Sequence, residues 1–162
     1  MAFKFYPALF LLFISFLSVG IATAQTNIAL GANTYSSSNE SGALLPGNTV
    51  DGSYTTRWAS GSADNQWIYL DLGQQYDFTE VKLFWETALG RDYNIEVSDD
   101  RFNWTVAESV TGNINLNNTI DITGFSGRYI RMYGLVRGTQ WGFSLWEFEV
   151  YGTPSVNAPV VN

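Results

Sequence analysis

Two segments in the last third of the chain alternate between residue types with a period of two. They span residues 127–134 and 142–152, and the loop between them carries an arginine and a tryptophan that neither segment needs for a core. A period of two places successive side chains on opposite faces of a strand. The pattern therefore predicts two β-strands that present the intervening loop, residues 135–141.

Alternating segments recur along the chain, whereas helix signals are nearly absent. In residues 81–85 and 93–97 the apolar side chains share one face, while Lys82, Asn94 and Glu96 take the other. One buried and one solvated face is typical of antiparallel sheets, so we predict an all-β sandwich, either a jelly roll or an immunoglobulin-like fold. The expected strands are residues 66–72, 79–85, 93–98, 104–110, 118–122, 129–136 and 143–151.

Both ends of the chain differ in composition from the segments between them. A short positive region, an apolar run from Phe5 to Ala22 and the small residues Ala22-Thr23-Ala24 predict a signal peptide over residues 1–24. A membrane anchor is the alternative. We expect a domain over residues 25–152 and a linker or tail over residues 153–162, with further modules after it. Because the chain has no cysteine, we expect a secreted bacterial protein that is stable without disulfides.

The charge of the chain limits its partners. Eight basic and 15 acidic residues give a net charge of −7, which repels nucleic acid and anionic lipid, so we expect neither a nucleic-acid partner nor a membrane. The same charge argues against strongly anionic polysaccharides. Aromatic residues make up 16% of the chain, a content usual for domains that stack on sugars, and we expect a monomer that binds a neutral polysaccharide or oligosaccharide.

Catalysis is not supported by the acidic residues. Glycosidases need two carboxylates that face one another across a cleft, and Glu147 and Glu149 instead share one face of a predicted strand. Glu86 and Asp92 offer no convincing pair either. Histidine and cysteine are absent, which removes the common nucleophile and base pairs and the usual zinc sites. We therefore expect a protein without enzymatic activity.

Several motifs in combination resemble the discoidin (factor 5/8 type C) family. They are Asp51-Gly52, Thr56-Arg57-Trp58, residues 66–73 and the two C-terminal strands with their loop. The resemblance runs from Asn27 to Gly152 and is closest to the bacterial carbohydrate-binding modules of the family 32, galactose-binding-domain-like type. It implies a jelly-roll sandwich of about eight strands and a non-catalytic accessory role in polysaccharide degradation.

The turn at Asp51-Gly52-Ser53 is a candidate site for a hard cation. Ca²⁺ takes about six to eight oxygen ligands, and short polar side chains with turning carbonyls supply them. The resemblance implies a structural Ca²⁺ held by Asp51, Thr56 and Glu147, together with the carbonyls of Asn48 and Ser53. The alternative is an Asx turn that is hydrogen-bonded to its own backbone.

Among the six tryptophans, Trp141 is the candidate for stacking on a ligand, because a loop has little other use for an apolar ring. Strand alternation predicts that Trp67, Trp85 and Trp146 pack in the core, and the resemblance implies the same for Trp58 and Trp104.

The resemblance places a carbohydrate over the loops at one end of the sandwich. Glu86 and Arg137 are the strongest polar candidates, since a charged pair at the rim can hold vicinal hydroxyls from both sides. A surface ion pair, or an Arg137 that braces its own loop, is the alternative. The full set implied is Tyr35, Glu40, Ser60, Asp64, Glu86, Arg91, Arg137 and Trp141.

The residue after Trp58 separates this chain from galactose-binding relatives. Many of them carry a histidine there, whereas this chain has Ala59. Trp85-Glu86, residues 90–93 and Arg137 instead resemble discoidin-type modules attached to bacterial β-glucanases, and this resemblance implies a neutral β-glucan as the ligand, with β-1,3-glucan (laminarin) first. The alternatives are a cell-surface adhesion or lipid-binding discoidin domain, a galactose-type lectin module and a structural spacer.

Overall fold

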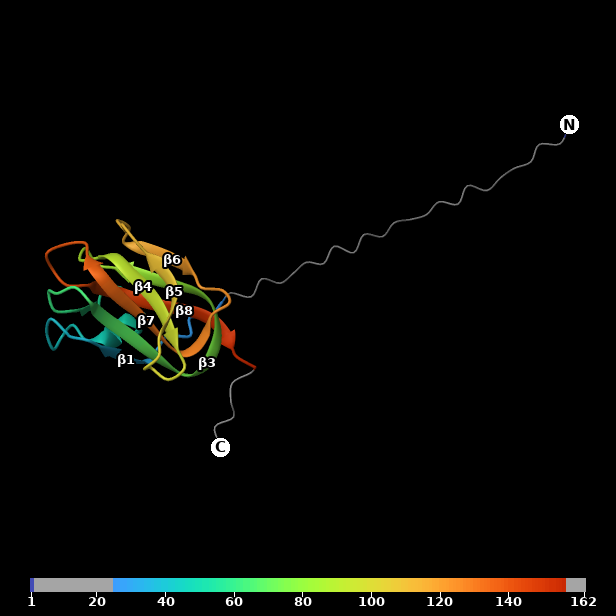
Figure 1. The fold of residues 1–162 in the computed structure, drawn as a ribbon, viewed down its shortest axis with the longest axis horizontal. Coiled ribbons are helices and arrows are strands. Elements are labelled where there is room, and N and C mark those ends of the chain that lie inside the picture. Colours follow the sequence, from blue (N-terminus) through green and yellow to red (C-terminus); the bar gives the residue numbers. More distant parts are fainter. Residues whose placement is uncertain (2–24, 157–162) are drawn as a thin grey trace.

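The computed structural model describes Met1 and residues 25–156 (Figure 1). Apart from Met1, the predicted signal peptide lies outside the described residues, as do residues 157–162. No helix in the described part is long and apolar enough to cross a membrane. The elements are β1 (Asn33–Ser36), the short 3₁₀ helix η1 (Pro46–Thr49), β2 (Trp58–Ala59), β3 (Gln66–Trp85), β4 (Gly90–Ser98), β5 (Thr105–Val110), β6 (Asn117–Asp121), β7 (Ser126–Arg137) and β8 (Ser144–Pro154).

The predicted all-β jelly-roll fold is confirmed. The eight strands run in the order β2-β8-β3-β7-β4-β5, with β1 and β6 also paired to β3, and every strand pair is antiparallel. All the strands expected from the alternation are present. The expectation missed β1 and β2, because four and two residues are too few to show a period. β8 continues to Pro154, which pairs with Tyr76, three residues beyond the end expected for this strand.

The long strand β3 belongs to both layers of the sandwich. Its residues 66–71 pair with β1 and β7, whereas residues 80–84 pair with β6 and β8. A register shift separates Asp71 from Tyr76, and Gly73 within it has φ +80°, which glycine adopts without strain. The two strands predicted over residues 66–72 and 79–85 are therefore one irregular strand.

Apolar side chains between the layers form one core. Ile68, Leu83, Ile130 and Met132 are fully buried, as are many of their neighbours. Burial of each large apolar side chain stabilises the fold by about 1.5–3 kcal/mol. Because the chain has no cysteine and forms no disulfide, this burial is the main force that drives folding.

Only two of the tryptophans predicted to be buried lie in the core. Trp58 and Trp85 are buried, but Trp67, Trp104 and Trp146 are half-buried and the expectation for them was wrong. In β3 the neighbouring Ile68 faces inward, so strand alternation turns Trp67 outward. Trp146 lies beside a register shift between β3 and β8, which places its neighbours on both sides in the interior.

Loops from four parts of the chain meet at one end of the sandwich, at the left of Figure 1. The Glu40 N–H donates to the Ala59 carbonyl at 2.8 Å, and the Gly61 N–H donates to Ser38 Oγ at 2.9 Å. The Glu86 N–H donates to the Ser144 carbonyl at 2.9 Å. The Ser60 N–H donates to the Phe143 carbonyl at 2.9 Å and links the two pairs, so the loops after β1, β2, β3 and β7 form one surface.

Candidate functional site

A pocket of about 250 Å³ opens at this loop end. Three of the predicted sugar-binding residues line it, namely Glu40, Glu86 and Trp141, and the Trp141 side chain is 58% exposed. The pocket therefore combines two carboxylates with an accessible aromatic ring. Its remaining walls come from Arg57, Ala59, Thr87, Ala88, Gly142 and Ser144.

Glu86 is held in place by its own loop. Its Oε1 accepts a hydrogen bond from the Thr87 hydroxyl at 2.8 Å, and its Oε2 accepts one from the Ala88 N–H at 3.0 Å. Burial acts to raise the pKa of Glu86, but these hydrogen bonds and the charge of Arg57 outweigh it, so the pKa lies below its usual value. The carboxylate therefore stays ionised in mildly acidic solution.

Arg57 is a pocket residue that sequence reasoning did not identify as one. Its Nη1 donates to Ser144 Oγ at 2.7 Å, and that hydroxyl donates to the Trp58 carbonyl at 2.9 Å. Its position in the sequence could have indicated this role. Arg57 precedes Trp58, which is buried, and neighbouring residues in an extended segment point in opposite directions. Arg57 therefore brings a positive charge into the lining of the pocket, where it acts on Glu86.

Arg137 holds the loop that carries Trp141. Its Nε donates to Asp64 Oδ1 at 2.9 Å, and its Nη1 donates to the carbonyls of Gln140 and Trp141 at 3.1 and 3.4 Å. The bond from Arg137 holds the pKa of Asp64 below its usual value. Arg137 thus pairs with Asp64 rather than with Glu86, which corresponds to the alternative in which it braces its own loop.

Ser60 is a structural residue of the loop end. It is 1% exposed, its hydroxyl donates to the Gly61 carbonyl, and it accepts the Phe143 N–H, both at 2.9 Å. A Cβ on Gly142 would approach the Ser60 carbonyl oxygen to 2.3 Å, so only glycine fits there. The hydroxyl of Ser60 is therefore used by bonds within the loop end, and Ser60 is not among the residues that line the pocket.

The two other predicted sugar-binding residues lie away from the pocket. Arg91 is exposed beside a separate depression that it shares with Leu89 and Gly138. Tyr35 lies on the outer face of the sheet, where its ring stacks on Tyr69 with 4.8 Å between centroids.

Four of the residues predicted to bind a cation, Asp51, Ser53, Thr56 and Glu147, are joined by hydrogen bonds. Glu147 is 1% exposed, and its Oε1 accepts the Ser53 N–H at 2.9 Å, while its Oε2 is buried without a partner. Burial raises the pKa of Glu147 to about 7, and Asp51 beside it adds to the effect. A buried carboxylate oxygen without a partner is costly unless a proton or a cation satisfies it.

Asp51 forms the Asx turn that is the alternative to a cation site in the sequence analysis. Its Oδ1 accepts the Ser53 N–H at 2.8 Å, and its Oδ2 accepts the Thr56 hydroxyl at 2.7 Å. The Asn48 side chain donates to the backbone carbonyls of Ala43 and Arg57, and the group predicted to bind the cation is the carbonyl of Asn48 itself. Within the described residues no group of three or more acidic, histidine or cysteine side chains could hold a metal, so hydroxyl and carbonyl oxygens would have to complete the site. The donors present are of the type that Ca²⁺ accepts.

Comparison with known proteins assigns the fold to a family. Residues 48–132 match the F5/F8 type C model that describes the NedA-like, galactose-binding domain. A search of curated proteins found no match. A fucose-binding module of Streptococcus pneumoniae is 21% identical with a TM-score of 0.68, over 79% of this chain and 96% of the module, which supports the fold alone.

Two solved modules from Paenibacillus sp. IK-5 are more similar in sequence. Chitosan-binding module 1 of a chitosanase/glucanase is 43% identical over 78% of this chain and 99% of its own length, with a TM-score of 0.76. Chitosan-binding module 2, solved with chitotriose, is 40% identical over 78% of this chain and its own full length, also with a TM-score of 0.76. Modules of this fold are typically non-catalytic accessory domains of glycoside hydrolases. The chain belongs to the F5/F8 type C, or discoidin, family and has the fold of its carbohydrate-binding modules.

Proposed function

We propose that this domain binds chitosan, the β-1,4-linked polymer of glucosamine, in the pocket at the loop end. The observation that carries the proposal is the meeting of Glu40, Glu86 and the exposed ring of Trp141 in one pocket. A pyranose presents a face of C–H groups that can lie on an aromatic ring. Its protonated amino group can donate charge-assisted hydrogen bonds to a carboxylate.

The charge of the whole chain supports the same ligand. A net charge of −7 attracts a polycation over long range and speeds its association. The low pKa of Glu86 keeps its carboxylate charged under acidic conditions in which the glucosamine amines carry their protons. The two modules that are 43% and 40% identical to this chain are themselves named as chitosan-binding.

A neutral β-glucan, the ligand expected from the sequence, would form fewer charge-assisted contacts in this pocket. It has C–H faces and hydroxyls but no amino group for two carboxylates to bind. We therefore assign the pocket to an amino sugar. Since the pocket is small and open, we expect a modest affinity, with Kd on the order of 10 μM to 1 mM, so that strong attachment to a polymer needs several contacts.

The first prediction tests the role of the pocket carboxylates. Glu86→Gln keeps the shape of the side chain and removes its charge, so binding of glucosamine hexasaccharide should weaken by about 1–3 kcal/mol. Isothermal titration calorimetry measures the loss. Affinity of the parent protein should also fall as the pH rises and the glucosamine amines lose their protons, while Glu86 stays ionised.

Ile114→Ala is the matched control for this titration, because Ile114 is 85% exposed and lies outside the pocket. It should bind the hexasaccharide as the parent does. If Glu86→Gln binds as tightly as the parent, or if the affinity does not change with pH, the amino-sugar assignment is wrong.

We further propose that the domain acts outside the cell. Residues 1–24 have the pattern of a signal peptide, and modules of this fold accompany glycoside hydrolases. In this role the domain holds a degrading enzyme at its polymer and raises the local enzyme concentration.

We also propose that Asp51, Thr56, Glu147 and the Ser53 carbonyl hold a structural Ca²⁺. The support is the buried Glu147 Oε2, which has no hydrogen-bond partner, beside the second carboxylate of Asp51. The ion would neutralise two carboxylates that otherwise repel one another and raise the pKa of Glu147.

Removal of calcium is therefore expected to destabilise the domain. An ion that binds only the folded state raises the melting temperature, so exhaustive chelation should lower it and added Ca²⁺ should restore it, as measured by calorimetric scanning. Asp51→Asn should melt at a temperature that calcium no longer changes. An unchanged melting temperature of the parent after chelation would rule out the ion.

A further inference from the structure

The outer face of the layer that contains β1, β3, β7 and β4 carries aromatic rings where a solvated sheet face usually carries polar side chains. Tyr35 and Tyr69 are cross-strand neighbours with stacked rings at 4.8 Å, and Trp67 stacks on Tyr69 at 5.6 Å. Tyr129 meets Tyr69 edge to face at 6.3 Å. Tyr35 is 46% exposed and Tyr129 is buried, while Trp67 and Tyr69 are half-buried. Clustered aromatic rings that remain open to solvent can mark a binding surface.

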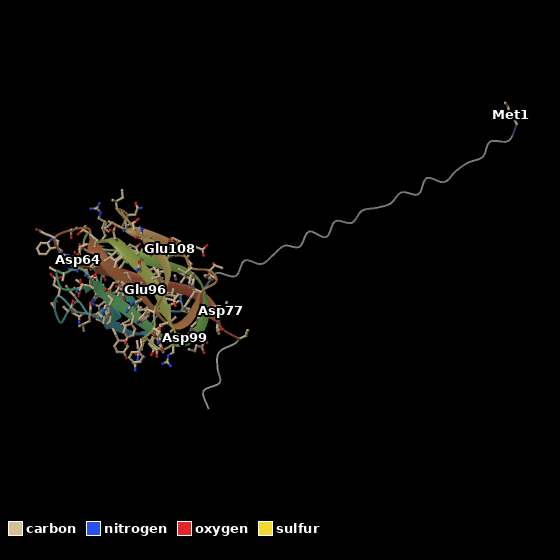
Figure 2. The ribbon with its side chains drawn as sticks, viewed as in Figure 1. Met1, Asp64, Asp77, Glu96, Asp99 and Glu108 are labelled. Carbon is tan, nitrogen blue, oxygen red and sulfur yellow. The ribbon has the colours of Figure 1, made fainter. Side chains whose placement is uncertain are left out.

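An open groove of about 420 Å³ lies on this face. Its floor comes from β3 and β7 and its wall from the loop between β4 and β5. It is distinct from the pocket with Trp141, because β4 starts at the loop end and runs away from it, and Figure 2 shows Asp64 and Asp99 at different ends of the domain. The lining residues are Trp67, Tyr69, Arg101, Phe102, Trp104 and Arg131.

The wall of the groove is built to present an exposed ring. Asp100 Oδ1 accepts the N–H groups of Phe102 and Asn103, both at 2.8 Å, and the Trp104 indole N–H donates to the Arg101 carbonyl at 3.0 Å. Arg101 has φ +62°, a strained value for a residue other than glycine. The ordered loop leaves Phe102 78% exposed, so its ring serves no packing purpose in the fold.

Two arginines line the groove, Arg101 and Arg131, whereas two carboxylates and one arginine line the pocket. The Arg131 guanidinium lies 4.2 Å from the Trp104 ring centre and forms an ion pair with Glu96 at 2.5 Å. Arg101 lies over Phe102 at 5.5 Å and has no carboxylate partner among the described residues. A polymer of glucosamine is disfavoured by this excess positive charge, and polyanions are disfavoured by the acidic domain as a whole.

We propose that this groove is a second carbohydrate-binding site, which takes a neutral β-glucan chain. Such a chain offers apolar ring faces to Phe102 and Trp104 and hydroxyl oxygens to the guanidinium of Arg101, without a charge that either the groove or the domain would repel. The proposal is independent of the amino-sugar pocket. A domain with both sites can attach to two polymers at once.

The test is an NMR titration of the domain with laminarihexaose and with cellohexaose. At least one should shift the indole signals of Trp67 and Trp104 and leave that of Trp141 in place. Phe102→Ala should weaken this binding by about threefold to tenfold, as expected for the loss of one aromatic contact. Its melting temperature should not change, since the removed ring is exposed.

Ile114→Ala is the matched control and should bind both glucans as the parent does. The proposal is overturned if neither glucan binds, if Phe102→Ala binds as well as the parent, or if the shifts occur at Trp141 instead. Titration of the same variants with glucosamine hexasaccharide separates the two sites, because that binding depends on the pocket and not on Phe102. Shifts produced by lipid vesicles, but by neither glucan, would assign the groove to a membrane instead.

Discussion

Replacing Trp141 by alanine should remove most of the affinity for glucosamine oligosaccharides and leave the melting temperature unchanged. The ring is 58% exposed and lines the pocket, so it can cover one face of a sugar. A central aromatic contact of this kind is worth about 2 kcal/mol or more, roughly a 30-fold loss in affinity. Because the side chain lies outside the core, its removal leaves no cavity.

Trp141→Phe provides the matched variant, since it keeps an aromatic face and should retain part of the binding. Calorimetric titration with glucosamine hexasaccharide measures affinity, and a thermal scan measures stability. If Trp141→Ala binds as well as the parent, the sugar does not lie on this ring and the pocket assignment is wrong.

Replacing Trp85 by alanine should have the opposite effect and lower the free energy of unfolding by about 3–5 kcal/mol. The side chain is 2% exposed, and its ring meets Tyr93 edge to face at 5.3 Å. Its indole N–H donates to Asn118 Oδ1 at 2.8 Å. The substitution leaves a cavity and removes a hydrogen bond at the same place, which denaturant unfolding will measure.

Trp67→Ala is the control for the size of this effect. Its ring is half-buried on the outer face and leaves no enclosed cavity when removed, so the loss of stability should be clearly smaller. Equal losses for Trp85→Ala and Trp67→Ala would contradict the placement of Trp67 outside the core.

The strands were predictable because alternation reflects a local property, the direction of each side chain relative to its neighbours. Alternation shows that two sets of residues face opposite ways, but it does not show which set faces the core. In residues 66–72 both sets contain large apolar side chains, since Trp67 and Tyr69 alternate with Ile68 and Leu70. The sequence therefore did not show whether Trp67 faces the core or the outer side of the sheet. Because tryptophan is usually buried, we predicted that it faces the core, and this prediction was wrong.

The site was predictable only in part because it is assembled from loops that are distant in sequence. Glu40, Glu86 and Trp141 come from three loops and meet in one pocket, as the family resemblance implied. The role of Arg137 depends on Asp64, which lies 73 residues earlier in the chain. No local pattern shows which acidic group an arginine will meet after folding, and the same holds for Arg57 with Ser144.

The place of β3 in both layers has a consequence for how the chain folds during synthesis. One half of this strand needs β7 as a neighbour and the other half needs β8, which is the last strand of this domain to leave the ribosome. The layer that contains β8 cannot be completed while residues 144–154 are still inside the exit tunnel, so the second half of β3 stays without this neighbour until then. Because loop closure over such distances slows folding, the nascent domain must keep its apolar strands from aggregating until its final segment emerges.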